Sequence, residues 1–328
     1  MLFLLKQDIL NESPIVLKKF LGYLQTVKGK SPKTVEEYFF DLRTFFRYLK
    51  LANRMVSPEV PFEEIKIDDV NIDLLKEVNL TDVFEYMNYV ATERNNHEAA
   101  RARKVSSLRH FFKYLTNKTQ ELSFNPVQEL ETPKLPKKLP KFLSLEQSKA
   151  LLNAAQTHGG NYKERDYCIL TLFLNCGLRL SELAGINLND YTPEGVLKIT
   201  GKGNKERVVY LNSSCKNALE SYRKVRPNDG LKDKSALFIS RQKNRISVKT
   251  IQLLVNKYLK SAGLGNMGYS VHKLRHTAAT LMYQHGHVDI RILKEILGHE
   301  NLGTTEIYTH IANSQMKDAL DSNPLSEN

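Results

Sequence analysis

The chain has 328 residues, of which 41% are hydrophobic and 26% are charged. This length allows two domains with separate cores, and the composition is typical of a soluble protein. We find no apolar run long enough to span a membrane, and the first residues are too short a stretch for a signal peptide. The net charge of +12 favours a polyanionic partner, with DNA as the first candidate, although charge alone leaves this open.

The three cysteines, Cys168, Cys176 and Cys215, form no C-x-x-C pair of the metal-binding type. We interpret them as buried or idle thiols of a protein in a reducing compartment, which predicts a cytoplasmic location.

Residues 12–117 are predicted to form helices with polar connections, because apolar residues recur there at helical spacing. The predicted helices cover 13–25, 34–50, a stretch from 80 through 89, and 99–115. Ser31 and Pro32 form a start signal for the second of these, with serine as N-cap and proline in the first turn. Residues 51–80 are predicted to be irregular.

The helix at 99–115 has a basic face and ends in R-H-F-F-K-Y-L, which is similar to R-T-F-F-R-Y-L at 43–49. Two amphipathic helices that share one core explain the similarity more simply than an old duplication. The basic face is either solvated or in contact with a DNA backbone. Its candidate contacts are Arg101, Arg103 and Lys104.

Residues 125–143 contain four prolines, which forbid a continuous helix and favour an extended, semi-rigid segment. We therefore predict a helical domain at 1–124, a linker at 125–143 and a second domain with a C-terminal tail at 144–328. Lys137 and Lys138 in this linker are either DNA contacts or part of a simple tether.

The second domain is predicted to begin with a helix that Ser144 and Gln147 cap. A buried helix at 162–176 follows and ends at Gly177. Arg179 comes next, in G-L-R-L-S-E-L, with Glu182 three residues along. A charged residue among leucines is costly to bury unless it is paired. The pair either braces two helices or serves a reactive site.

Two β-rich runs at 196–200 and 206–211 flank the turn G-K-G-N-K at 201–205 and predict a hairpin. The turn lacks the spacing of a Walker A loop, so we interpret it as a basic finger on DNA. Its candidate contacts are Lys202, Lys205 and Arg207. A capped helix at 248–262 is the best candidate for a helix on a DNA groove. Basic residues on and before it, Arg241, Lys243, Arg245 and Lys249, are its candidate contacts.

The stretch 270–310 concentrates residues suited to phosphoryl transfer: His272, Arg275, His299 and Tyr308. Arginine binds phosphate with a rigid fork of donors, histidine moves protons near neutral pH, and tyrosine can form a covalent ester. His272 and Arg275 share a helix face because they are three residues apart. A metal site at His272 and His276 is disfavoured, since H-E-x-x-H and a completing carboxylate or cysteine cluster are missing.

Together, and in this order, these motifs resemble the tyrosine recombinase (phage integrase) family. The matching residues are Arg179 in G-L-R-L-S-E-L, Lys202 in G-K-G-N-K-E-R, His272 and Arg275 in H-K-L-R-H-T-A-A-T, His299 in L-G-H and Tyr308 in I-Y-T-H. The resemblance covers the catalytic half closely and the first half more loosely, and it is greatest to Xer-type proteins and short integrases of mobile elements. The arm-binding domain of lambda-type integrases is expected to be missing.

The resemblance implies a mainly α fold with a small antiparallel β-sheet in the second domain, as a two-domain clamp on DNA. It implies that Tyr308 attacks a DNA phosphate to form a 3′-phosphotyrosyl link. Arg179 and Arg275 would bind the phosphate, with Glu182 supporting Arg179. Lys202 would protonate the leaving oxygen, and His272 would accept the tyrosine proton. His299 would donate to the phosphate.

The same resemblance implies no cofactor, neither metal nor ATP, because the ester conserves the bond energy. The expected partners are a double-stranded recombination site, three further copies or a paralogue in a tetramer with a Holliday junction, and an accessory directionality factor. Chromosome-dimer resolution, integration and excision of mobile elements, and inversion remain open as roles. The alternatives are a DNA-binding protein of the same fold without catalysis and a topoisomerase-like enzyme.

Overall fold

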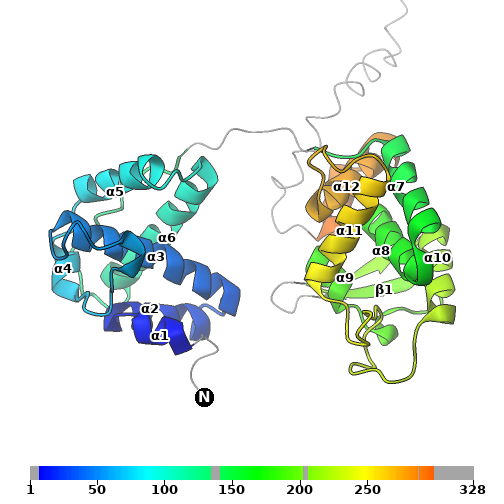
Figure 1. Ribbon diagram of the computed structural model, residues 1–328, viewed down its shortest axis with the longest axis horizontal. Helices are drawn as coiled ribbons and strands as arrows, with labels where there is room; N and C mark the ends of the chain where they lie inside the picture. The colour runs from blue at the N-terminus through cyan, green and yellow to red at the C-terminus, as the bar shows by residue number, and fades with distance from the viewer. Residues whose placement is uncertain (1–6, 134–140, 202–205, 287, 299–328) are drawn as a thin grey trace, which may run out of the picture. The chain divides into compact units, whose positions relative to one another are not determined.

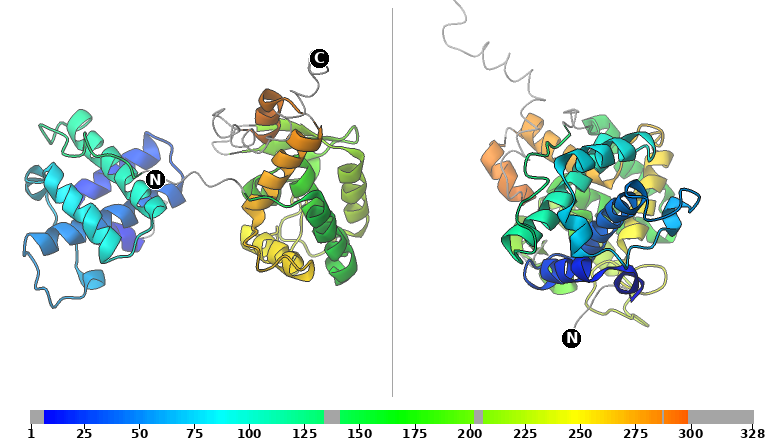
Figure 2. Two further views of the ribbon diagram at one scale, coloured as in Figure 1. Left: turned by 90° about the horizontal axis from the view of Figure 1, so that it is seen from above. Right: turned by 90° about the vertical axis from the view of Figure 1, so that its left-hand side faces the viewer.

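The computed structural model describes residues 7–133, 141–201, 206–286 and 288–298. The chain divides into two compact units, Met1–Lys137 and Lys138–Asn328. Figures 1 and 2 show each unit as its own cluster of helices, and the second contains a two-stranded antiparallel sheet. The predicted mainly α fold with a small sheet is therefore confirmed. Within the described ranges, no helix has the length and apolar character needed to cross a membrane.

The first unit is a helical bundle around an aromatic core. Its helices are α1 (Gln7–Glu12), α2 (Ile15–Thr26), α3 (Pro32–Ala52), α4 (Ile72–Lys76), α5 (Leu80–Thr92) and α6 (Glu98–Asn117). The two similar sequence segments meet in this core. Phe46 lies edge-on to Phe111 with ring centroids 5.6 Å apart, and Phe45 to Phe112 at 6.0 Å. Both segments therefore fill one core, as the simpler of the two explanations requires.

The connection predicted to be irregular contains a 3₁₀ turn at Phe62–Glu64 as well as α4. Long-range contacts hold it against α3. Arg47 donates to the carbonyl of Ile65, and Lys50 donates to the carbonyl of Lys66 and to the carboxylate of Asp69. The prediction missed this order because the contacts that hold the connection come from α3 and not from its own spacing of apolar residues.

The second unit is built around α8 (Lys163–Cys176), most of whose residues are buried. Helices α7 (Leu145–His158), α10 (Ser213–Val225) and α12 (Val271–Gly286) pack against it. The remaining elements are α9 (Leu180–Gly185), β1 (Val196–Thr200), β2 (Glu206–Tyr210), α11 (Val248–Ser261), α13 (Ile290–Leu297) and two 3₁₀ turns, Gly160–Tyr162 and Leu188–Asp190. The sequence prediction missed α10, although Asn212 caps it and its buried residues recur at helical spacing.

Two helices of this unit end at glycines in the left-handed conformation. Gly177 after α8 has φ +57°, and Gly298 after α13 has φ +62°. Glycine adopts this conformation without the steric cost that a Cβ atom imposes. Gly177 ends α8 two residues before Arg179, and Gly298 ends α13 one residue before His299.

The predicted hairpin pairs in antiparallel fashion from Val196 opposite Tyr210 to Thr200 opposite Glu206. Leu197, Ile199 and Val209 turn toward the core, and the alternate residues face outward. Arg207 is an exception to the expectation that the basic residues near this turn reach outward, because its side chain is only 16% exposed.

Candidate active site and nucleic-acid interface

A pocket of about 670 Å³ lies in the second unit where α9, α11 and α12 meet. Arg179, His272 and Arg275 all line it, and so does Lys249 from α11. The fold thus brings together residues that are far apart in the sequence, because α9 and α12 both begin at this pocket. The lining is strongly basic, which suits an anionic ligand such as a phosphate.

Glu182 is the carboxylate beneath this pocket, and it is only 4% exposed. Its Oε1 atom accepts hydrogen bonds from Arg179 and from Arg207, both at 2.7 Å. Its Oε2 atom accepts from the backbone N–H of Arg179 at 2.7 Å and from Arg207 at 3.0 Å, and it lies 4.0 Å from Arg275. The sequence predicted the pairing with Arg179 but missed the part played by Arg207.

The pKa of Glu182 reflects this environment. Burial alone would raise the pKa, but the hydrogen bonds from Arg207 and Arg179 outweigh it and lower the pKa to about 2. The carboxylate is therefore ionised throughout the physiological range, and it orients the arginines as a fixed anion.

Three arginines also bind the end of α13. Arg207 donates to the carbonyl of Ile296 at 3.4 Å, Arg275 to that of Leu297 at 2.6 Å, and Arg179 to that of Gly298 at 2.7 Å. Arg275 donates in addition to the carbonyl of Gly177 at 2.6 Å. Helix ends leave such carbonyls without partners inside the helix, so these guanidinium groups satisfy them. The segment before His299 is thereby fastened to the pocket.

His272 lies at the mouth of the pocket, with its ring edge-to-face to that of His276 at 4.8 Å between centroids. Burial lowers the pKa of His272 below its usual 6.5, and the positive charges of Arg275, Lys273 and Arg179 lower it further. For His276, burial and the neighbouring His272 lower the pKa to about 4. Both rings are thus neutral at pH 7, and His272 can accept a proton.

Several predicted site residues lie outside the described residues. They are Lys137 and Lys138 in the linker, Lys202 and Lys205 in the turn, and His299 and Tyr308 near the end of the chain. Their roles stay predictions that rest on the sequence.

Some residues that were predicted to contact DNA bind groups within the protein in the structure. Lys104 was predicted to lie on an exposed basic face. The structure instead buries it, with its ammonium group 3.2 Å from Asp41. Arg245 holds Asp233 and the carbonyls of residues 184–186, and Arg207 holds Glu182. Sequence reasoning placed these cations on the surface because the acids and carbonyls that bind them are distant in the sequence.

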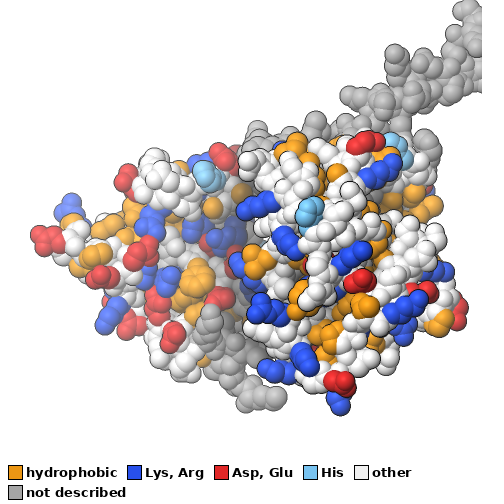
Figure 3. Space-filling model, turned by 45° about the vertical axis from the view of Figure 1, so that its right-hand side comes forward, with side chains coloured by type: hydrophobic (Ala, Val, Ile, Leu, Met, Phe, Trp, Pro, Cys, Tyr) orange, Lys and Arg blue, Asp and Glu red, His pale blue; other side chains and the backbone are white. Residues whose placement is uncertain are grey.

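The other predicted contacts lie at or near the surface. Lys249 and Arg241 are exposed, and Lys243 is exposed while it donates to the carbonyl of Asp229. Arg101 pairs with Glu98 at 3.7 Å, and Arg103 has a side chain that is 45% exposed. Lys and Arg side chains are spread over the visible face in Figure 3, among apolar and uncharged groups.

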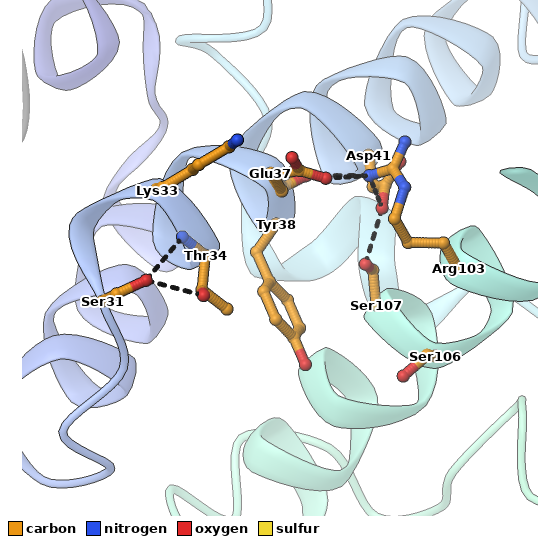
Figure 4. A pocket seen from close by; sticks show the side chains of 9 residues that line it. All are labelled: Ser31, Lys33, Thr34, Glu37, Tyr38, Asp41, Arg103, Ser106 and Ser107. Carbon is orange, nitrogen blue, oxygen red and sulfur yellow. Dashed lines mark hydrogen bonds and ion pairs between the residues drawn. The ribbon is translucent and has the colours of Figure 1, made fainter. Parts of the chain in front are cut away.

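Another pocket, of about 330 Å³, lies in the first unit between α3 and α6. Figure 4 shows its lining, which is rich in hydroxyl groups and has Arg103 at one side. Buried Asp41 holds this side in place: it accepts from Arg103 at 2.6 Å, from Ser107 at 2.8 Å and from Lys104. Hydroxyl and guanidinium groups bind nucleic-acid phosphates. Here Arg103 is also paired with the carboxylates of Asp41 and Glu37, and Glu37 lines the pocket too. Sequence reasoning found Arg103 but missed the hydroxyls of Ser31, Thr34, Tyr38 and Ser106.

The chain is similar to known proteins over most of its length. The model of the phage integrase family matches residues 141–315. A tyrosine recombinase XerC of Caldanaerobacter subterraneus subsp. tengcongensis is 54% identical over 314 residues, which cover 96% of this chain and 88% of that protein. The tyrosine recombinase XerC of Thermodesulfovibrio yellowstonii is 34% identical, with 95% of this chain and 97% of that protein covered.

Solved structures share the fold at lower identity. The post-cleavage complex of the XerH site-specific recombinase with a palindromic difH substrate has a TM-score of 0.72 at 21% identity and covers 96% of this chain and 86% of that one. A lambda integrase (75–356) dimer bound to a core site has a TM-score of 0.61 at 16% identity, with 88% and 94% covered. The family match over more than half of the chain and the close XerC relative together show that the chain belongs to the phage integrase family, as a tyrosine site-specific recombinase.

Proposed function

We propose that the pocket around Arg179, His272 and Arg275 is the place where this recombinase binds the scissile DNA phosphate. One observation carries the proposal: these residues line a single basic pocket above a buried carboxylate that binds Arg179. Arg179 and Arg275 bind the non-bridging oxygens and offset the negative charge that develops in the transition state. Glu182 holds Arg179 in the orientation that this task needs.

The proposed reaction has two balanced steps. The Tyr308 hydroxyl gives its proton to His272, and its oxygen bonds to phosphorus while the bond to the 5′-oxygen breaks. Lys202 protonates the departing 5′-oxygen, and His299 donates a hydrogen bond to the phosphate. A 5′-hydroxyl from a partner strand then gives its proton to Lys202 and attacks the phosphotyrosine, while His272 returns its proton to the leaving oxygen of Tyr308. The strands are joined and Tyr308 is regenerated without metal or ATP.

The proposed partner is a double-stranded recombination site. The first unit contributes the hydroxyl-rich pocket beside Arg103, and α11 contributes exposed Lys249. We propose that four copies, or two copies and two of a paralogue, join two duplexes in a Holliday junction in the cytoplasm, with an accessory directionality factor as a possible further partner. Relatives that are named XerC favour chromosome-dimer resolution as the role.

Covalent trapping tests this proposal. The protein is incubated with nicked suicide DNA from around its own gene, in EDTA and without ATP, and run on a denaturing gel. We expect a covalent adduct, which trypsin reduces to one DNA-linked peptide. Trypsin cuts after Lys294 and Lys317, and Tyr308 is the only tyrosine in the peptide between them. The assignment of Tyr308 is therefore read directly by mass spectrometry.

A Tyr308→Phe protein is the control, because it lacks only the nucleophilic oxygen. Binding of DNA on a native gel without any adduct in the wild-type protein would favour a DNA-binding protein without catalysis. An adduct on another peptide would show that the nucleophile is a different residue. Relaxation of a plasmid with a scrambled site would favour the topoisomerase-like alternative.

The lowered pKa of His272 predicts the pH dependence of cleavage. Because the imidazole stays neutral below its usual pKa of 6.5, we expect the rate of adduct formation to fall only at pH values below 6.5. The rate is measured at saturating DNA from about pH 5 to pH 8, where histidine titrates. Native gels at each pH control for loss of binding. An acid limb centred above pH 6.5 would contradict the role of His272 as proton acceptor.

A further inference from the structure

The side chain of Arg207 points inward from β2 and contacts both partners that hold the phosphate-binding arginines. Its two terminal nitrogens donate to the two carboxylate oxygens of Glu182, at 2.7 and 3.0 Å. Its Nε atom donates to the carbonyl of Ile296 in α13. We propose that Arg207 is a positioning residue for strand cleavage, which aligns Arg179 and Arg275 through Glu182 and the end of α13. This inference rests on the proposed function of the pocket.

Arg207 holds the carboxylate of Glu182 with two donors. A carboxylate that binds a guanidinium fork with both oxygens is fixed in its plane as well as in its position. Arg207 supplies that fork, so it fixes the plane in which Oε1 accepts from Arg179. Without the fork, the two oxygens keep only the backbone N–H and the side chain of Arg179 itself as donors, so the carboxylate and the Arg179 side chain that it orients are held less firmly.

Arg207 also packs against Gly298. A Cβ atom built on this glycine would lie 3.0 Å from Cδ, 3.2 Å from Nε and 3.3 Å from Cζ of Arg207. The arginine therefore packs directly on the backbone of the glycine whose carbonyl accepts from Arg179. Arg207, Glu182, Arg179 and Gly298 form a closed ring of contacts. Arg275 joins the same structure through the neighbouring carbonyl of Leu297.

Two other tasks for Arg207 are distinguishable from this one. The residue follows Lys202 by five positions, so it could instead hold the strand that carries the proposed acid. It could also stabilise the fold without any influence on the reacting phosphate. Each alternative predicts a different response to chemical changes at the scissile phosphate, and the experiment uses that difference.

The test measures single-turnover adduct formation by wild-type protein and by Arg207→Lys, which keeps the charge but lacks the fork. On unmodified DNA we expect the variant to cleave roughly 10–100-fold more slowly, as is typical when catalytic groups are displaced by about 1 Å. Binding of DNA on native gels is expected to change little. Arg226→Lys is the matched control, because Arg226 is a buried arginine that binds carbonyls away from the pocket.

Two modified substrates decide how Arg207 acts. A methylphosphonate at the scissile position removes the charge of one non-bridging oxygen and so lessens the need for aligned arginines. We expect the deficit of Arg207→Lys to shrink on it. A 5′-bridging sulfur provides a leaving group that needs no acid. We expect the deficit to remain on this substrate, whereas Lys202→Ala recovers.

The other possible results would overturn the proposed role of Arg207 or the proposed function of the pocket. Recovery of Arg207→Lys on the sulfur substrate would overturn the proposal in favour of the strand that carries Lys202. An equal deficit on every substrate, or wild-type cleavage by the variant, would overturn it in favour of a purely structural role. If Arg207→Lys does not fold, Gly298→Ala replaces it, since the added Cβ disturbs the same contact. Absence of any wild-type adduct on unmodified DNA would instead count against the proposed function itself.

Discussion

Replacing Arg275 by alanine is expected to lower the rate of strand cleavage by at least about 10²–10³, because the loss of even one preorganised donor to a transition state costs about 2.7–4 kcal/mol. Arg275 lines the pocket although it is only 4% exposed. Its guanidinium group also donates to the carbonyls of Gly177 and Leu297, which would lose these donors in the variant. Each buried carbonyl that loses its donor adds about 1–3 kcal/mol of destabilisation.

The measurement is single-turnover cleavage of suicide DNA together with thermal unfolding of the same preparation. Arg275→Lys serves as the control because it keeps a positive charge but cannot reach two carbonyls with a planar fork. We expect the lysine variant to recover part of the stability and little of the cleavage rate. Cleavage by the alanine variant at the wild-type rate would show that Arg275 serves the fold alone.

Replacing Glu182 by alanine is expected to destabilise the second unit by about 3–5 kcal/mol, because removal of one partner leaves buried charges without compensation. Arg179 and Arg207 both depend on this carboxylate, and the side chain of Arg207 is only 16% exposed. Urea denaturation at neutral pH measures the loss. A variant as stable as the wild type would mean that water replaces the carboxylate at no cost.

The same carboxylate predicts how stability depends on pH. Its pKa is 4.5 when unfolded and about 2 in the folded protein, so its contribution is complete above pH 4.5 and disappears as the pH falls toward 2. The shift corresponds to about 3 kcal/mol at most. We expect the stability difference between wild type and Glu182→Gln to shrink over this window. A difference that stays constant from pH 6 to pH 3 would contradict the lowered pKa.

Local features of the fold could be predicted from the sequence because their causes are local. Ser31 and Ser144 cap helices as predicted, and Gly177 ends one. Each such signal depends on residues within one helical turn. The grouping of Arg179, His272 and Arg275 was predicted only through family resemblance, since no local rule brings α9 to α12.

The partners of charged residues could not be predicted. The sequence pattern predicts that Lys104 and Arg207 are surface cations. In the structure Asp41 in α3 binds Lys104, and Glu182 in α9 binds Arg207. A lysine or arginine has the same local pattern whether it faces solvent or a distant carboxylate. Burial of a charge depends on the partner that compensates it, and that partner is set by the tertiary fold.

The way the second unit neutralises its arginines has a consequence for the charge of the site. Within the described part of the chain, Arg179 and Arg207 bind Glu182 and Arg275 lies 4.0 Å from it, so this one carboxylate does not by itself balance the three guanidinium charges. The carbonyls of Gly177, Leu297 and Gly298 stabilise the excess without adding a formal negative charge. A phosphodiester carries one negative charge, and attack by a tyrosine oxygen that has lost its proton brings in a second. At the proposed phosphate site, this excess of positive charge stabilises the doubly charged, five-coordinate phosphorus more than the intact DNA, which is the condition for binding energy to lower a barrier.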